Sequence, residues 1–170
     1  MVSYTDLYNK NAAFYRKRPA ARLALKIGNA VLTLGFMLAY ALLLFYGVFH
    51  DFTPKRLTGL LCVPCICLFT VSVLRIFLPR PRPFAADGAG ITPLFPKKNV
   101  QNNSFPSRHL ACAGVIATVF LPHFIGVAVG LYGGAVLLGY IRFSAGWHYP
   151  TDLLAGVLLG GGIGALIFLF

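Results

Sequence analysis

The chain of 170 residues has the length of one domain, and its composition excludes an ordinary soluble fold. Hydrophobic residues make up 58% of it and charged residues 11%, whereas soluble domains carry about 25% charged residues. The mean hydropathy of +0.75 and several long uncharged runs predict an all-α, polytopic membrane helical bundle.

The charge is strongly basic, with 15 Lys and Arg against four acidic residues, all of them Asp. Carboxylate-only chemistry and carboxylate cages for metal ions are therefore nearly excluded, and we expect no metal and no other cofactor. A net charge of +11 suits nucleic acid or an anionic membrane and its phosphorylated lipids. The apolar bulk favours the membrane and argues against nucleic acid.

Residues 1–26 are not apolar enough to span a bilayer. Aromatic and apolar side chains can share one helical face there, with a basic run beside it: Tyr4, Leu7, Tyr8 and Tyr15, then Arg16, Lys17 and Arg18. This pattern predicts an interfacial helix lying on the membrane, with a disordered segment as the alternative. We therefore divide the chain into an interfacial segment, 1–26, and a transmembrane domain, 27–170.

About five transmembrane helices are predicted after that segment. The uncharged run 27–49 has 23 residues, about 34 Å as a helix, and a bilayer core is roughly 30 Å thick. A second run, 57–74, continues to Leu78, where Pro79, Pro81 and Pro83 stop it, and Pro64 inside it is a candidate kink.

The remaining helices follow a polar loop, 79–106, which is rich in Gly, Pro and Asn, too long for a tight turn and too polar to lie in lipid. Such loops usually carry function. A third helix is predicted from near Pro106 to before Pro122, a fourth over 124–142, and a fifth from Pro150 to the end.

Small residues inside the predicted helices are interpreted as packing residues. Glycines recur every four residues in two places, Gly126, Gly130 and Gly134, and Gly156, Gly160 and Gly164. Each set lies on one helical face and permits close backbone approach. The four cysteines, Cys62, Cys65, Cys67 and Cys112, lie in apolar runs and are interpreted as buried small hydrophobes.

Polar residues gather on one side of the predicted bilayer, because the second and fourth helices end there and the third and fifth begin there. That side carries Arg75, Arg80 and Arg82, then Ser107, Arg108 and His109, then Arg142, His148 and Asp152. The opposite side carries only His50, Asp51, Lys55, Arg56 and His123 outside the apolar runs.

Arginines that face two helix N-termini predict a site for phosphate, because guanidinium groups and free backbone N–H groups both donate to it. Pro106 and Pro150 favour first helical positions and place the following polar residues in first turns. Two histidines and an aspartate suit phosphoryl transfer through a covalent intermediate. His148 would attack phosphorus, Asp152 would hold its other ring nitrogen, and His109 would protonate the leaving oxygen. No metal is needed if the arginines carry the charge.

Ordinary structural roles are the alternative for single residues. We interpret Arg80, Lys97 and Lys98 as snorkelling anchors, and His50 and His123 as structural. Asp152 has the position of a helix cap. Convergence of the other residues on one side favours a site over separate structural roles.

The same residues form three spaced motifs. Arg75 and Arg82-Pro83 are separated by six residues, Pro106-Ser107-Arg108-His109 follows, and Arg142, His148 and Asp152 are separated by five and then three residues. This pattern resembles the type 2 phosphatidic acid phosphatase (PAP2) family, whose motifs are K-x6-R-P, P-S-G-H and S-R-x5-H-x3-D. The resemblance covers roughly residues 70–156, and the joint spacing is very specific.

The resemblance implies an all-helical membrane core and a metal-independent phosphohistidine mechanism. It implies His148 as nucleophile, Asp152 as its partner and His109 as the acid. The phosphate ligands it implies are Arg75, Arg82, Arg142 and Ser107.

Three positions depart from the motifs. Arg75 replaces lysine and keeps the charge. Ile141 replaces serine and removes a hydroxyl beside Arg142. Arg108 replaces glycine, and we expect it to bind a second phosphate or another polar part of a head group, or else to point into the lipid interface.

These residues predict a membrane lipid phosphatase that hydrolyses a phosphomonoester or diphosphate of a lipid whose tail stays in the bilayer. By resemblance, the candidate substrates include phosphatidate, phosphatidylglycerol phosphate and polyprenyl phosphates or diphosphates. The alternatives are a phosphotransferase to an alcohol acceptor and a non-catalytic phospholipid-binding or transport protein. The sequence does not indicate an oligomeric state.

Basic residues outside the motifs predict the orientation of this multi-pass cell-membrane protein. Nine lie on the site side and two on the other. By the positive-inside rule, the active site faces the cytoplasm. The familiar six-helix members of the family present their site on the other side of the membrane.

Overall fold

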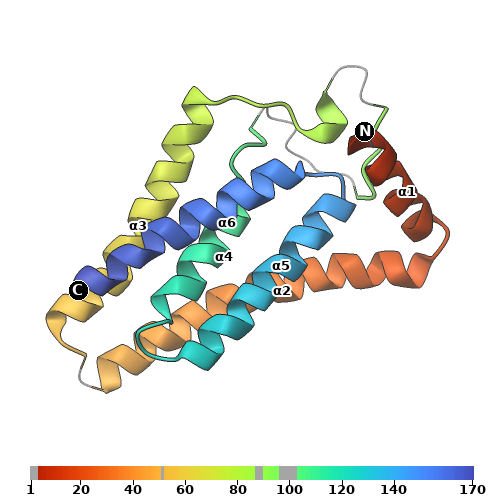
Figure 1. The fold of residues 1–170 in the computed structure, drawn as a ribbon. Helices are drawn as coiled ribbons and strands as arrows, with labels where there is room; N and C mark the ends of the chain where they lie inside the picture. The colour runs from red at the N-terminus through yellow and green to blue at the C-terminus, as the bar shows by residue number, and fades with distance from the viewer. Residues whose placement is uncertain (1–3, 51, 87–89, 96–102) are drawn as a thin grey trace.

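The computed structural model describes residues 4–50, 52–86, 90–95 and 103–170, most of which are helical. The helices are α1 (Tyr4–Arg16), α2 (Pro19–Phe49), α3 (Pro54–Phe77), η1 (Pro83–Ala85), α4 (Arg108–Val119), α5 (Ile125–Ser144), α6 (Pro150–Gly164) and η2 (Ala165–Leu169). Figure 1 shows the long helices packed as a bundle, with the two ends of the chain at opposite ends of it. The predicted all-α membrane bundle is confirmed.

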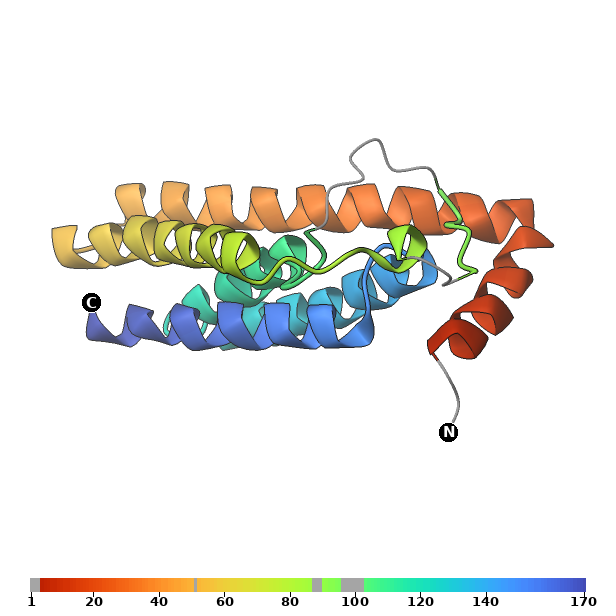
Figure 2. The same cartoon turned by 90° about the horizontal axis from the view of Figure 1, so that it is seen from above.

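One end of the bundle gathers the starts of α2, α4 and α6 and the ends of α3 and α5, as Figures 1 and 2 show. We call it the site end, and we call the end with the α2–α3 and α4–α5 connections the far end. α1 also lies at the site end. This arrangement brings the three sequence motifs, which are spread over some eighty residues, to one place.

Four helical segments in the described part of the chain are long and apolar enough to cross a membrane: Pro19–Phe49, Pro54–Phe77, Ile125–Ser144 and Pro150–Leu169. α4 differs from the prediction of a fifth span. Its 12 residues extend about 18 Å, less than a bilayer core of roughly 30 Å. Nine of those residues are buried, so α4 forms the core around which the longer helices pack.

Prolines set several helix boundaries, as the sequence predicts, but Pro106 is not the first residue of a helix, because α4 begins at Arg108 with Ser107 as its N-cap. α3 ends at Phe77 before the proline-rich segment, and Pro150 is the first residue of α6. α2 begins at Pro19, so residues 19–26 are continuous with the helix that contains the apolar run 27–49. Pro64 lies inside α3, which runs on through it.

The glycines of α6 let it pack directly on α4. A Cβ atom at Gly160 would lie 2.1 Å from the carbonyl oxygen of Ala111, and one at Gly156 would lie 2.6 Å from that of Ser107. Because a side chain has no room there, these glycines determine how closely the two helices approach. The predicted packing role is confirmed for this set.

The other glycine set does not pack in the predicted way. No atom outside the local helix lies within 4 Å of a Cβ placed at Gly126 or Gly130, and Gly134 makes only ordinary contact with Phe36. Spacing in the sequence was the same in both sets. Only the α6 set meets the backbone of another helix.

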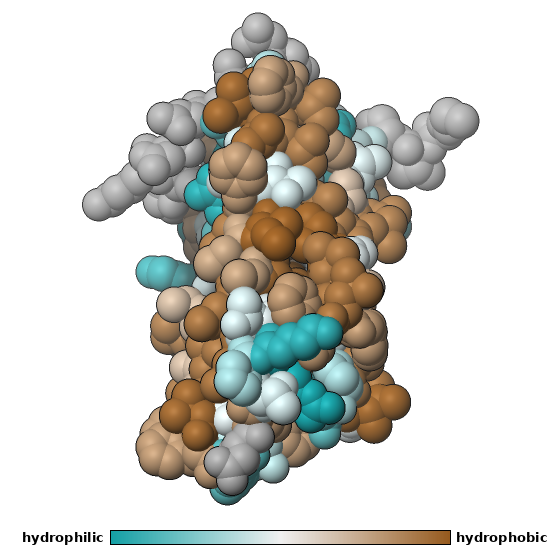
Figure 3. Space-filling view, turned by 90° about the vertical axis from the view of Figure 1, so that its left-hand side faces the viewer, coloured by the Kyte–Doolittle hydropathy of each residue, from teal (hydrophilic) through white to brown (hydrophobic). Residues whose placement is uncertain are grey.

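The outer surface of the long helices is apolar, as expected for contact with lipid. On α2 the exposed side chains include Val31, Leu34, Leu38, Leu42, Phe45 and Phe49. Figure 3 shows one face of the molecule as mostly hydrophobic, with a small hydrophilic area. All four cysteines are free, but Cys62 and Cys65 are exposed on α3, so the prediction that they are buried is wrong.

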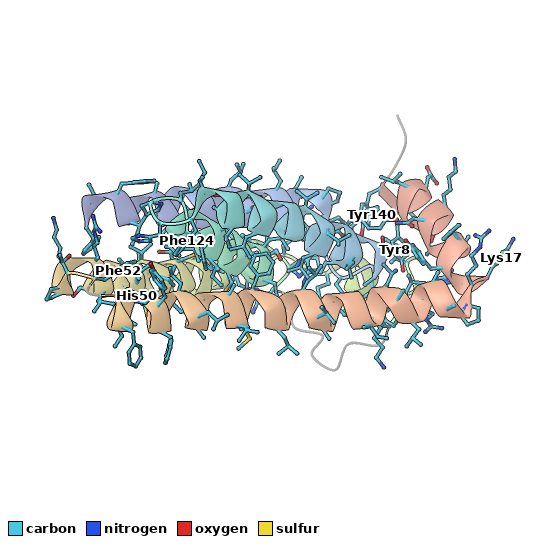
Figure 4. The ribbon with its side chains drawn as sticks, turned by 90° about the horizontal axis from the view of Figure 1, so that it is seen from below. Tyr8, Lys17, His50, Phe52, Phe124 and Tyr140 are labelled. Atoms are coloured by element: carbon cyan, nitrogen blue, oxygen red, sulfur yellow. The ribbon has the colours of Figure 1, made fainter. Side chains whose placement is uncertain are left out.

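α1 lies across the site end of the bundle (Figure 2). Its tyrosines do not face the membrane as the sequence suggested, because Tyr8 and Tyr15 are buried against the protein. Figure 4 shows Tyr8 and Tyr140 in the space between α1 and α5, and Lys17 pointing away from the bundle. The face that α1 exposes carries Leu7 and Phe14 together with basic residues.

Candidate active site

A short loop between α5 and α6 positions His148. The backbone of Gly146 has a φ of +76°, a conformation that favours glycine, and it turns the chain from α5 towards α6. Tyr149 precedes Pro150, and its N–H donates to Oδ2 of Asp152 at 3.0 Å. Asp152 therefore does cap α6, and the same cap holds its carboxylate beside the loop.

The contacts of His148 determine its tautomer. Nδ1 lies 3.0 Å from the carbonyl oxygen of Ser104, which only accepts hydrogen bonds, and 3.6 Å from Oδ2 of Asp152. Nε2 lies 3.2 Å from Nη1 of Arg82, which only donates. The proton is therefore on Nδ1, and Nε2 presents a lone pair towards Arg82. The side chain is buried, with 1% of the residue exposed.

Two residues near Asp152 were not among the predicted site residues. The Ser104 hydroxyl donates to Oδ2 of Asp152, and Nη1 of Arg80 donates to Oδ1 at 2.8 Å. Arg80 also donates to the Thr151 hydroxyl at 2.8 Å. The interpretation of Arg80 as a snorkelling anchor is therefore wrong: its head group binds the carboxylate, which a buried Asp requires.

The signal for Arg80 was present in the sequence, two residues before Arg82, but a basic residue at a helix end most often has the structural role we gave it. Ser104 offered no such signal. It reaches the site because the loop pairs Arg80 with Asn103, and the Ser104 N–H donates to the Arg80 carbonyl at 2.9 Å.

The arginines of the motifs lie in one cluster. Arg75 and Arg82 both donate to the carbonyl oxygen of Asn103, and Arg82 also donates to that of Trp147 at 2.9 Å. Arg82 is close enough to both Arg75 and Arg142 for their charges to repel. All three are buried, and burial lowers the pKa of Arg82 while Asp152 opposes that shift.

Several donors in this cluster remain unpaired. Within the described part of the chain, the Nε atoms of Arg82 and Arg142 and the Oγ of Ser107 are buried and have no hydrogen-bond partner. Burying an unpaired polar atom is costly, so such atoms are rare in folded proteins. Three of the predicted phosphate ligands thus each have a buried polar atom without a hydrogen-bond partner, which few other described residues have.

The start of α4 brings the second motif to the same end. Ser107 precedes the helix, and its N–H donates to the carbonyl oxygen of Asp152 at 2.9 Å. Arg108 and His109 occupy the first turn and are exposed, and they line a groove of about 210 Å³ with Phe36, Met37 and Cys112. Arg108 lies near enough to Arg75 for their charges to interact.

No three His, Cys, Asp or Glu side chains lie close enough to hold a metal ion in the described residues. The cations of the site are guanidinium groups instead. The carboxylate of Asp152 interacts with Arg75, Arg80 and Arg82, and Arg142 lies close to Arg82. These four arginines give the site a net positive charge suited to an anion.

Three comparisons relate this chain to known proteins. The PAP2 superfamily model matches residues 56–170. Lipid A 1-phosphatase of Rhizobium etli is 38% identical over 58 residues, which cover 34% of this chain and 25% of that protein. Undecaprenyl-diphosphatase BcrC of Bacillus subtilis is 37% identical over 93 residues, which cover 54% of this chain and 45% of that protein. The chain thus matches less than half the length of these curated relatives.

Two solved structures resemble the whole bundle. LpxE of Aquifex aeolicus aligns with a TM-score of 0.61 and 28% identity over 86% of this chain and 93% of that one. A transmembrane PAP2-type phosphatidylglycerolphosphate phosphatase from Bacillus subtilis aligns with a TM-score of 0.54 and 25% identity, over 95% and 90% of the two chains. The family model spans more than half of the chain, and its relatives share the membrane bundle: this membrane protein belongs to the PAP2 superfamily.

Proposed function

We propose that the protein is an integral-membrane phosphatase that hydrolyses a phosphomonoester or diphosphate of a membrane lipid. The observation that carries the proposal is the set of unpaired, buried donors on Arg82, Ser107 and Arg142, with the guanidinium of Arg82 at 3.2 Å from Nε2 of His148. Phosphate oxygens would accept hydrogen bonds from those donors. The same donors would stabilise the charge that develops on the oxygens during transfer.

The proposed reaction has two steps. Nε2 of His148 attacks phosphorus, and the bond from phosphorus to the leaving oxygen breaks while that oxygen takes a proton from His109. In the second step water attacks phosphorus, His109 takes a proton from that water, and the bond between phosphorus and Nε2 of His148 breaks to release phosphate. Arg75, Arg82, Arg142 and Ser107 would hold the phosphoryl oxygens through both steps, and the mechanism requires no metal.

Asp152 supports the nucleophile in this proposal. Its Oδ2 lies 3.6 Å from Nδ1 of His148, and its other oxygen is held by Arg80. As positive charge develops on the imidazole, the carboxylate would stabilise it and keep the ring oriented. The carbonyl oxygen of Ser104, 3.0 Å from Nδ1 of His148, would accept a hydrogen bond from the proton on that nitrogen.

The substrate is proposed as a lipid because the site lies at the end of a bundle whose long helices expose apolar side chains. Phosphatidate, phosphatidylglycerol phosphate and polyprenyl phosphates or diphosphates are the candidates. The exposed Arg108, at the start of α4, would contact a second phosphate or another polar part of the head group.

We also propose that the site faces the cytoplasm, since nine basic residues outside the motif positions lie on the site side and two on the other. A reporter fused to the C-terminus tests this orientation. The fold places Phe170 at the far end (Figure 1), so a reporter active outside the cytoplasm supports it and a cytoplasmic one contradicts it.

The test of function is phosphate release by the purified protein in detergent with excess EDTA. The panel contains phosphatidate, phosphatidylglycerol phosphate, and polyprenyl mono- and diphosphate, each with and without an added alcohol. We expect release that survives EDTA and disappears in His148→Ala, whereas His123→Ala at the far end keeps it. A folded protein that releases no phosphate from any of these lipids contradicts the proposal. Product that forms only with the alcohol would favour the transferase.

A further inference from the structure

α1 follows the segment that carries His148, with contacts in antiparallel order. Its residues Tyr15, Asn11, Tyr8 and Tyr4 meet, in turn, Tyr140, Ser144, Gly146 and the His148–Tyr149 pair. These four α1 residues are spaced so that they share one helical face. α1 precedes all three sequence motifs, yet it contacts the loop that the third motif contains.

Tyr8 makes the tightest of these contacts. A Cβ atom at Gly146 would lie 2.9 Å from the Tyr8 hydroxyl and 3.0 Å from the ring, so the ring lies directly over the turn. The residue is fully buried, and its hydroxyl donates to the carbonyl oxygen of Thr92 at 2.7 Å. The turn two residues before His148 is therefore covered by a side chain that is itself fixed.

The other contacts lie on either side of that turn. Nδ2 of Asn11 donates to the Ser144 hydroxyl at 2.9 Å, where α5 ends. The Tyr4 hydroxyl lies 3.4 Å from the His148 carbonyl oxygen, and the Tyr4 and Tyr149 ring centroids are 4.8 Å apart. The guanidinium of Arg80, which binds Asp152, lies 4.1 Å from the centroid of the Tyr149 ring.

We propose that Tyr4, Tyr8 and Asn11 of α1 are positioning residues that hold the His148 loop in its reactive geometry. The inference rests on the proposed role of His148 as nucleophile. Residues 145–149 connect α5 and α6. The N–H groups of Ala145, Gly146 and Trp147 bond back to the end of α5, and α1 adds its contacts further along, at Gly146 and at the His148 carbonyl oxygen. A displacement of about 1 Å in a reacting group can lower a rate about 100-fold.

The test uses the full-length protein in detergent and two readouts. Turnover of the lipid phosphate gives kcat and KM. Trp147, the one tryptophan of the chain, lies within the loop and reports its order through quenching by acrylamide. Tyr8→Ala removes the ring over Gly146, and Tyr8→Phe keeps the ring but removes the hydrogen bond to Thr92. Phe14→Ala, on the exposed face of the same helix, is the matched control.

We expect Tyr8→Ala to lower kcat about 10- to 100-fold with KM within about twofold of wild type, and to increase Trp147 quenching. Tyr8→Phe should restore kcat to within about threefold, and Phe14→Ala should leave both readouts unchanged. Wild-type kcat and quenching in folded Tyr8→Ala overturn the proposal, as does an equal loss in Phe14→Ala.

If Tyr8→Ala does not fold, Asn11→Ala provides the test, since it removes one hydrogen bond without opening the core. We expect a smaller fall in kcat and a measurable rise in quenching, and no change in either overturns the proposal. The tryptophan readout separates the two hypotheses. A wild-type protein without phosphatase activity contradicts the proposed function, whereas quenching that does not respond to Tyr8→Ala contradicts positioning by α1.

Discussion

Both ends of the bundle carry histidines and basic side chains, but in different surroundings. At the far end, the ring centroids of His50 and Tyr46 are 4.1 Å apart and those of His123 and Phe52 are 4.5 Å apart. Figure 4 shows His50 and Phe52 at this end, near Phe124. At the site end, His148 is buried and contacts Arg82, which belongs to the arginine cluster with unpaired donors. A histidine at a bundle end that also carries basic residues is therefore not enough to indicate a site. Burial of the histidine together with unpaired donors that converge on one place does indicate one.

The pKa of His123 fits its aromatic surroundings at the far end. Burial and the charge of Arg56 both lower the pKa of His123, so this side chain is neutral at neutral pH and above. Its aromatic contacts are then those of an uncharged ring. This supports the structural role that the sequence predicts for it.

The largest effect on activity is expected for substitution of His148, compared with the same substitution of His123. His148→Ala should lower phosphate release by a factor on the order of 10⁴ or more, because no other residue takes its place as nucleophile. His123→Ala should stay within about twofold of wild type, since His123 lies far from the reaction. A comparable loss in both variants, measured on folded protein, would contradict the distinction between the ends.

The arginines sharpen the same comparison. Arg142→Gln removes a buried guanidinium with an unpaired Nε and should lower kcat about 10²- to 10³-fold, as the loss of a donor to a transition-state oxygen does. Arg56→Gln, an equal loss of charge at the far end, should have little effect. Initial rates of both variants on one lipid phosphate provide the measurement.

Substitution of two glycines tests whether the close packing of α6 on α4 stabilises the bundle. Gly160→Ala places a methyl group against the backbone of Ala111 and should lower the free energy of unfolding by about 3 kcal/mol. Gly130→Ala, which meets no atom within 4 Å, should change it by less than about 0.5 kcal/mol. Thermal unfolding in detergent distinguishes these values. Equal melting temperatures would mean that the close approach of α4 and α6 is not required.

His109 is predicted to act as an acid, which makes its effect depend on the leaving group. His109→Ala should lower the rate about 100-fold on a lipid phosphomonoester and much less on a substrate with a good leaving group, such as a nitrophenyl phosphate. Rates on both substrates provide the measurement. Equal losses on the two would show that His109 has another role.

The smallest predicted effect concerns Arg80. Arg80→Gln removes the partner of Asp152 Oδ1 but leaves the bonds from Ser104 and Tyr149 in place, so kcat should fall only about tenfold. Lys55→Gln, a basic residue near a helix start at the far end, should have no effect. A wild-type kcat in Arg80→Gln would return Arg80 to the role of a membrane anchor.

Much of the bundle follows from local sequence. Long uncharged runs indicate the membrane helices, and prolines mark the end of α3 and the start of α6. The motif residues converge because helix topology alone places their segments at one end. Each of these inferences uses the composition of single segments and their order along the chain.

The sequence did not indicate which helix surfaces pack against each other in the folded protein. The two glycine sets have the same spacing, yet only that of α6 lies against a neighbouring backbone. The tyrosine face of α1 has the pattern of an interfacial helix but packs on the α5–α6 loop. Ser104 reaches Asp152 across 48 positions in the chain, a contact that no local pattern encodes.

Direct detection of the phosphoenzyme tests the central claim most closely. The full-length protein is mixed with a lipid whose phosphoryl group carries ³²P, quenched in alkaline denaturant, and digested for peptide mapping. The account predicts acid-labile label on the peptide that contains His148, present in wild type and in His123→Ala and absent in His148→Ala. Label on another residue, or phosphate release by His148→Ala at the wild-type rate, would contradict it.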